Sequence, residues 1–103
     1  MKDVHGWVFR SALGPDAALA ALSTHGDGFT WAIRESDTQG RYVNGTDPTG
    51  VRVRVIGDPA AELELYLPGP GRGGPLGDDA ANALRARIPA LLSRIGAVDV
   101  HED

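Results

Sequence analysis

The 103-residue chain contains no cysteine, and this absence excludes several kinds of chemistry. Without a thiol there can be no disulfide framework, no thiolate nucleophile and no cysteine-ligated zinc or iron–sulfur cluster. The only lysine is Lys2, so the positive charge comes almost entirely from arginine, while alanine, glycine and proline are abundant. We associate this composition with the codon usage of a GC-rich bacterial genome, and the association carries no mechanism.

A long apolar run is also missing from the N-terminal region. The stretch from Met1 to Leu13 includes Asp3, His5 and Arg10, so it lacks the continuous apolar segment of a signal peptide or a membrane span. We therefore expect a cytoplasmic protein with no membrane partner.

Positive charge is too sparse and too dispersed for a nucleic-acid binder. The formal net charge is −4, and residues of both signs are scattered along the chain. Proteins that bind nucleic acids normally concentrate basic residues in a patch or stripe. Nucleic acid is therefore not the expected partner. A chain of this length has room for one hydrophobic core, so residues 1–103 should form a single domain.

Hydrophobic periodicity predicts an α+β fold. Residues 5–13, 29–35, 51–56, 62–67 and 98–100 have strand character, with a further short strand at 41–44, while residues 15–25 and 78–95 have helical spacing. We expect a mainly antiparallel sheet of four to six strands with two helices packed on one face, in the order β-α-β-(β)-β-β-α-β. The closest common type is a ferredoxin-like plait with an extra strand.

Several local features refine this fold. Gly14, Pro15 and Asp16 predict a helix start with proline at its first position. Gly26 and Gly96 are the expected C-terminal caps. Pro89 predicts a kink, or a division into two short helices, near residues 85–89. The aromatic residues at period-two positions are expected in the core; they are Trp7, Phe9, Phe29 and Trp31.

The segments 51–56 and 62–67 predict a hairpin with a specific register. If Val55 faces Leu63, then Arg54 lies opposite Glu64 and Arg52 lies opposite Tyr66. The arginine and glutamate rows are then interpreted as an ordinary solvated sheet face with cross-strand ion pairs, against the alternative of a binding face.

Two polar segments are predicted to be loops. Residues 44–50 consist of turn-forming residues, and an exposed polar loop is a common place for function. Residues 69–74 match the glycine pattern of phosphate-binding loops, but Pro70 removes an N–H donor and the following acidic pair, Asp78 and Asp79, would repel a phosphate. A connector, or a loop whose Arg72 contacts a partner, is the favoured interpretation.

No catalytic or metal-binding arrangement is convincing. His5, His25 and His101 do not have the spacing of a known metal motif. No serine lies in a strand-to-helix elbow of the hydrolase type, and the paired carboxylates fall in turns, caps or termini. We therefore assign no catalytic, cofactor-binding or metal-binding residues and expect no cofactor, although a minor enzyme stays open.

The favoured function is a non-catalytic protein-binding module. In size and composition over the whole chain, the protein resembles the immunity proteins that neutralise polymorphic toxins. The resemblance implies an inhibitor that covers the active site of a toxin or enzyme, steered by acidic residues. The predicted partner-binding residues are Glu35, Asp37, Arg41, Asp47 and Arg72.

Two alternatives remain open at this point. The first is a small-molecule-binding protein or minor enzyme with its pocket between the loops at 44–50 and 68–77. The second is a subunit that forms a homo-oligomer by pairing its sheet edges with a copy of itself.

Overall fold

The computed structural model describes residues 4–24, 28–38, 40–67 and 78–103. The predictions for the helix cap at Gly26, for His25, for the glycine pattern at 69–74 and for Arg72 lie outside the described residues.

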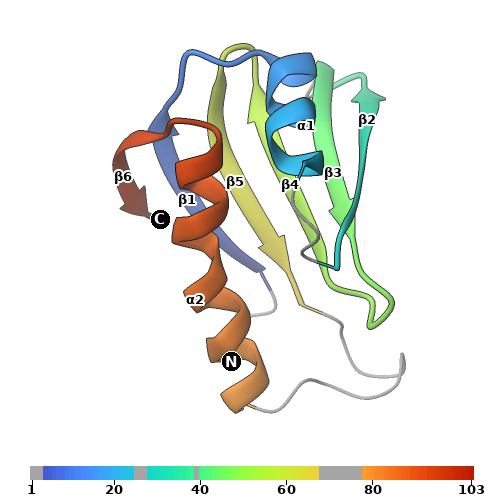
Figure 1. The fold of residues 1–103 in the computed structure, drawn as a ribbon, viewed down its shortest axis with the longest axis vertical. Helices are drawn as coiled ribbons and strands as arrows, with labels where there is room; N and C mark the ends of the chain where they lie inside the picture. The colour runs from blue at the N-terminus through green and yellow to red at the C-terminus, as the bar shows by residue number, and fades with distance from the viewer. Residues whose placement is uncertain (1–3, 25–27, 39, 68–77) are drawn as a thin grey trace.

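Six strands form one antiparallel sheet, and both helices lie on the same face of it (Figure 1). The strand order across the sheet is β2-β3-β4-β5-β1-β6. In chain order the elements are β1 (Val4–Arg10), α1 (Pro15–Ser23), β2 (Thr30–Ser36), β3 (Gly40–Thr46), β4 (Arg52–Gly57), β5 (Ala60–Tyr66), α2 (Asp78–Arg94) and β6 (Val98–Glu102). The predicted α+β class, the antiparallel sheet and the element order are confirmed.

The connections are those of an enlarged ferredoxin-like plait. The β1-α1-β2 crossover passes over three strands, and the β5-α2-β6 crossover passes over β1. The plait itself follows the order β-α-β-β-α-β and has four strands. The meander from β2 to β5 adds two strands to the plait, which corresponds to the expected order with its optional strand present.

Both helices begin or end as their local sequences predict. Gly14 is the N-cap of α1 and Pro15 follows as the first helical residue. After α2, Gly96 has a φ of 67°, and the amide of Ala97 donates to the carbonyl of Leu92 at 3.0 Å. This bond, together with the one from Gly96 N to Ser93 O, closes the helix in a Schellman motif.

The core lies between the helices and the covered face of the sheet. Alternating residues of β1, β4 and β5 point into it, and the helices add Ala18, Leu22, Ile88, Leu91 and Leu92. Trp7 and Phe9 are buried as predicted, while Phe29 and Trp31 are partly buried against the cluster. The Trp31 ring packs closely against Gly45, where a Cβ atom would approach it to 2.5 Å.

Two expectations about element boundaries are wrong. The segment 44–50 is not one loop, because β3 continues to Thr46 and Asn44 is buried in it. The turn-forming residues are accommodated since Gly45 leaves room for Trp31. The division of the last helix is also wrong: α2 runs through Pro89 as one helix. Pro89 is exposed, and Ile88 and Leu92 on either side of it are anchored in the core.

Candidate functional site

The face of the sheet opposite the helices, called the open face below, carries a row of polar and aromatic side chains. Val53 and Val55 of β4 point into the core, so Arg52 and Arg54 point to the open face. Arg52 pairs with Tyr66 of β5, and Arg54 pairs with Glu64. Both pairings are those predicted. Neither described helix lies over this face (Figure 1).

The arginines stack on tyrosine rings from both neighbouring strands. The Cζ atom of Arg52 lies 4.7 Å from the centroid of the Tyr66 ring. The Cζ atom of Arg54 lies 5.1 Å from the Tyr66 centroid and 5.3 Å from that of Tyr42, on β3. Tyr42, Arg52, Arg54 and Tyr66 are called the arginine–tyrosine cluster below. Each such contact contributes roughly 0.5–1 kcal/mol at exposed sites and orients the guanidinium group.

Glu64, two residues before Tyr66 on β5, lies beside the arginine–tyrosine cluster. The Tyr66 hydroxyl donates a hydrogen bond to Oε1 of Glu64 at 2.8 Å. Partial burial raises the pKa of Tyr66, and the hydrogen bond and charge of Glu64 raise it further, against the opposing effect of Arg54 and Arg52. Tyr66 therefore stays a neutral donor well into the alkaline range.

Among the described residues, Arg52 and Arg54 form no ion pair with a carboxylate. The ion pairs among the described residues involve other arginines, namely Arg10, Arg41 and Arg85. The Nε atoms of Arg52 and Arg54 are buried and have no hydrogen-bond partner. Arg54 thus faces Glu64 in register without forming the expected cross-strand ion pair. These side chains are half-buried and stacked, which distinguishes them from freely solvated ones.

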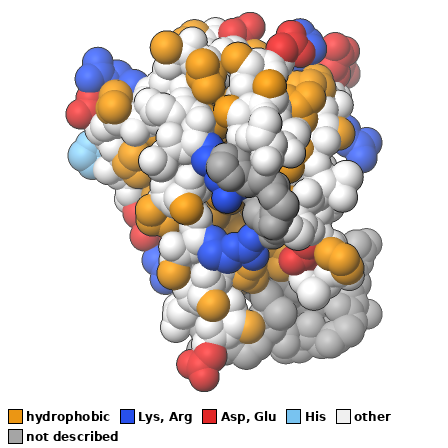
Figure 2. All heavy atoms as spheres, viewed as in Figure 1, with side chains coloured by type: hydrophobic (Ala, Val, Ile, Leu, Met, Phe, Trp, Pro, Cys, Tyr) orange, Lys and Arg blue, Asp and Glu red, His pale blue; other side chains and the backbone are white. Residues whose placement is uncertain are grey.

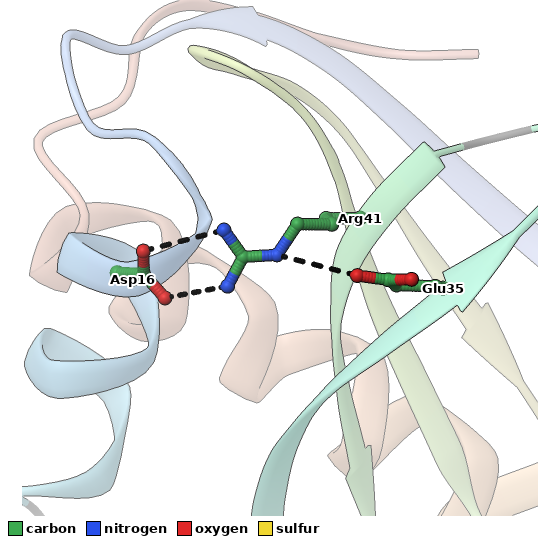
Figure 3. A network of polar contacts seen from close by, with 3 residues as sticks. All are labelled: Asp16, Glu35 and Arg41. Carbon is green, nitrogen blue, oxygen red and sulfur yellow. Dashed lines mark hydrogen bonds and ion pairs between the residues drawn. The ribbon is translucent and has the colours of Figure 1, made fainter.

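The predicted contacts Glu35, Asp37 and Arg41 lie together at one end of the β2–β3 hairpin. The guanidinium of Arg41 reaches both Asp16 oxygens, with distances of 2.8 and 3.4 Å, and its Nε lies 3.8 Å from Glu35 (Figure 3). Asp16 is the main cause of the raised pKa of Arg41. The network ties the start of α1 to the β2–β3 hairpin. Asp37 is exposed in the adjoining turn.

Asp47 lies at the other end of β3 and serves its own turn. Its Oδ1 accepts hydrogen bonds from the amide and hydroxyl of Thr49, at 2.9 and 2.7 Å, and from the amide of Val51 at 3.0 Å. Six residue-to-residue steps of about 3.3 Å each separate Arg41 from Asp47, so the distance between them is roughly 20 Å. Of the predicted partner-binding residues that the structure describes, Asp47 is therefore apart from the group of Glu35, Asp37 and Arg41.

The remaining reactive side chains are also separated. His5 is buried on the helix-covered face, whereas His101 is exposed on the opposite side of β6, paired with Val8. Within the described ranges no group of three histidine, aspartate or glutamate residues could hold a metal ion. The Ser11 hydroxyl donates to the carbonyl of Ile95 at 2.7 Å, so it links β1 to the end of α2.

The helix-covered face has an apolar hollow at its edge. Its volume is about 180 Å³ and its wall is formed by Trp7, Pro89, Leu92, Ser93, Ala97 and Val100. Over this face, Figure 2 shows acidic and basic side chains scattered among uncharged surface. The hollow lies between α2, β1 and β6, away from the pocket position predicted near residues 44–50.

Comparisons of the sequence with protein-family models and with curated proteins find no match. In the part of the chain that the structure describes, no helix has the length and apolarity needed to cross a membrane.

The arginine–tyrosine cluster is only partly visible in the sequence. The hairpin register already placed Arg52 opposite Tyr66. The missing element was Tyr42, which reaches Arg54 only because β3 pairs with β4 as Tyr42 opposite Ile56. The sequence does contain a signal for it. Arg52 and Arg54 alternate with the valines of β4, and Tyr42 is next to Val43 in β3, so all three fall on the face opposite the buried valines.

Proposed function

We propose that this chain is a non-catalytic protein-binding module whose contact surface is the open face, centred on the arginine–tyrosine cluster. The observation that supports the proposal is the stacking of Arg52 and Arg54 on Tyr66 and Tyr42 on a sheet face that neither described helix covers. Tyrosine and arginine are the residue types most often found at the energetic centre of protein interfaces.

The cluster is prepared for binding before a partner arrives. The tyrosines belong to central strands, and Tyr42 is only 8% exposed. Stacking restricts the guanidinium groups, so less side-chain entropy is lost when they are ordered in an interface. Arginines that a rigid sheet already orients therefore lose less entropy on binding than arginines on a flexible polar surface.

The finer part of the proposal is an inhibitor of the immunity type in a bacterial cytoplasm. Such an inhibitor acts by occlusion, which requires a stable domain and an extensive contact face and needs no catalytic group. Glu35, Asp37, Arg41 and Asp47 remain proposed peripheral contacts. Because Arg41, Asp47 and Glu35 already have intramolecular partners, Asp37 is the member best suited to steer a basic partner.

The pocket predicted for a small-molecule binder lies between residues 44–50 and 68–77, and residues 68–77 lie outside the described part of the chain. The apolar hollow beside Trp7 has a volume of about 180 Å³. Pockets for drug-sized ligands usually measure roughly 300–1,000 Å³.

The test is capture of the partner with matched surface variants. Tagged wild-type protein, Arg54→Glu and Arg87→Glu would be incubated with lysate of the source cells, and the complexes weighed by native mass spectrometry. Arg87 is exposed on α2, so its variant makes the same charge change on the helix-covered side. We expect one stoichiometric protein with wild type and Arg87→Glu, and its loss with Arg54→Glu.

Circular dichroism and the melting temperature would establish that each variant is folded. A partner that Arg54→Glu retains would contradict the open face as the contact surface. Recovery of the bare chain from every sample, or of an adduct of small mass, would contradict the binding-module proposal itself. A parallel Glu35→Arg, Asp37→Arg variant reports on the hairpin end, where unchanged capture would remove these two residues from the interface.

A further inference from the structure

The charges on the open face are separated across the sheet. Arg34, Arg52 and Arg54 lie on β2 and β4, and none of them takes part in the ion pairs of the described residues. The glutamates of the same face, Glu62 and Glu64, lie on β5. An acidic protein thus presents a basic area over β2 to β4, beside an acidic area that begins at β5.

The arginine side chains have unused donors. The Nε atoms of Arg52 and Arg54 are buried without a hydrogen-bond partner, so a partner protein does not reach them. Their terminal Nη groups take part in none of the ion pairs of the described residues, and stacking occupies only the planar face of a guanidinium, so the Nη N–H groups at its edge are left for an acceptor. A carboxylate fits this edge because its two oxygens match the fork of N–H donors.

The spacing of the arginines matches an extended peptide. Arg52 and Arg54 are two residues apart on one strand, so their Cα atoms are separated by about 6.6–6.8 Å. A partner segment in extended conformation repeats its side chains on one side with the same period. Carboxylates at every second residue of such a segment therefore face both arginines at once.

We infer that the cluster binds an extended acidic segment of the partner protein, with aspartate or glutamate at alternate positions. The inference rests on the proposed function and adds the chemistry of the partner. A polyphosphate backbone is disfavoured, since Glu62 and Glu64 border the cluster and the net charge of the chain is −4. The carboxylates of a short segment are few enough to avoid that acidic border.

The test uses a synthetic peptide of alternating glutamate and serine with the full chain. A peptide of the same composition, with its glutamates in one block, is the control for spacing, and an alternating lysine–serine peptide is the control for charge. Binding is followed by NMR through the arginine Nε–Hε signals and the backbone amides, in wild type, Arg54→Gln and Arg87→Gln.

We expect saturable shifts at Arg52, Arg54 and the adjoining residues of β3 and β5 with the alternating peptide. Loss of one charged contact should weaken binding roughly three- to fivefold in Arg54→Gln and leave Arg87→Gln unchanged. Raising the salt concentration from about 50 mM to about 300 mM should weaken binding further, because exposed charges are screened. The block peptide should bind more weakly than the alternating one.

The inference would be overturned if wild type and Arg54→Gln bound the alternating peptide equally well, or if the shifts were confined to other surfaces. Equal binding of the block peptide, or tighter binding of single-stranded DNA than of the alternating peptide, would also overturn it. Shifts of the same signals on concentrating the protein alone would assign the face to a second copy and would also overturn it. The proposed function fails separately, since it depends on capture of a protein partner and on its loss with Arg54→Glu. If the chain captures a partner but does not bind the alternating peptide, the proposed function stays in place and only the inference fails.

Discussion

The Trp31 ring leaves no room for a side chain at Gly45 of β3. A Cβ atom on Gly45 would lie 2.5–2.9 Å from three atoms of the Trp31 ring. Trp31 cannot give way easily because it packs against the core and against Phe29, with ring centroids 5.4 Å apart. We expect Gly45→Ala to lower the free energy of unfolding by about 1–3 kcal/mol, as overpacking commonly does. Urea denaturation followed by tryptophan fluorescence measures the change.

Gly6 provides the matched control for this substitution. It lies in β1, and the nearest atom to its added Cβ would be Asp103 Cβ at 3.7 Å, an ordinary van der Waals distance. Gly6→Ala should therefore change the free energy of unfolding by no more than about 0.5 kcal/mol. Equal effects of the two substitutions would show that the Trp31 ring is not the cause.

Tyr66 predicts a pH dependence of stability on the alkaline side. Its pKa is raised above the ordinary 10.0, first by burial and then by the hydrogen bond to Glu64. The folded protein therefore retains the phenolic proton at a pH where the unfolded chain has lost it. This contribution to stability is complete below the unfolded pKa and is lost as the pH rises through the folded pKa.

The comparison of wild type with Tyr66→Phe isolates this effect. We expect the wild type to lose stability relative to Tyr66→Phe as the pH rises above the ordinary tyrosine pKa, because phenylalanine has no proton to lose. Urea denaturation at a series of pH values measures the difference. Parallel curves for the two proteins through the alkaline range would exclude Tyr66 as the titrating group.

Among the elements, Ser11 connects the end of β1 to the end of α2. Its hydroxyl donates to the carbonyl of Ile95 at 2.7 Å and accepts from the amide of Leu13 at 3.1 Å. Ser11→Ala leaves both backbone groups without this partner, so we expect a loss of about 1 kcal/mol in the free energy of unfolding. Ser93→Ala, at an exposed position of α2, is the control and should stay within about 0.5 kcal/mol.

The β4–β5 hairpin could be predicted because several local signals agree on its register. Placing Val55 opposite Leu63 buries the apolar row and also sets Arg54 opposite Glu64, and the structure has both pairings. The extent of β3 could not be predicted, since Asn44 and Gly45 have turn propensity and their strand conformation depends on pairing with β2 and β4 and on the contact of Gly45 with Trp31. That contact involves a different strand, which local propensity does not include.

Prediction of the site was limited in the same way. The hairpin register could indicate Arg52 beside Tyr66, but the stacking of Arg54 between Tyr66 and Tyr42 requires three strands in their final order. The strand register also predicts an ion pair between Arg54 and Glu64. In the structure, Glu64 instead accepts a hydrogen bond from the Tyr66 hydroxyl. Competition between hydrogen-bond donors for one carboxylate depends on side-chain geometry, which the sequence pattern does not specify.

At the scale of the whole molecule, both edges of the sheet carry features that oppose pairing with another chain. The strand β6 has five residues, and its pairing with β1 is irregular between Val8 and Arg10. Two of its side chains are engaged in ion pairs, Asp99 with Arg10 and Glu102 with Arg85. The other edge, β2, carries Arg34 and Glu35. Short, charged and irregular edges are common means of preventing edge-to-edge association.

We therefore expect the free protein to be a monomer whose melting temperature does not depend on its concentration. For an obligate oligomer, mass action raises the melting temperature with protein concentration. Sedimentation equilibrium and thermal melts over about a hundredfold range of concentration test this expectation. A dimer in sedimentation, with a melting temperature that rises over the same range, would favour the homo-oligomer hypothesis. In that case Arg54→Glu would decide whether the two copies meet through the open face or through the sheet edges, because only the first contact depends on the arginine–tyrosine cluster.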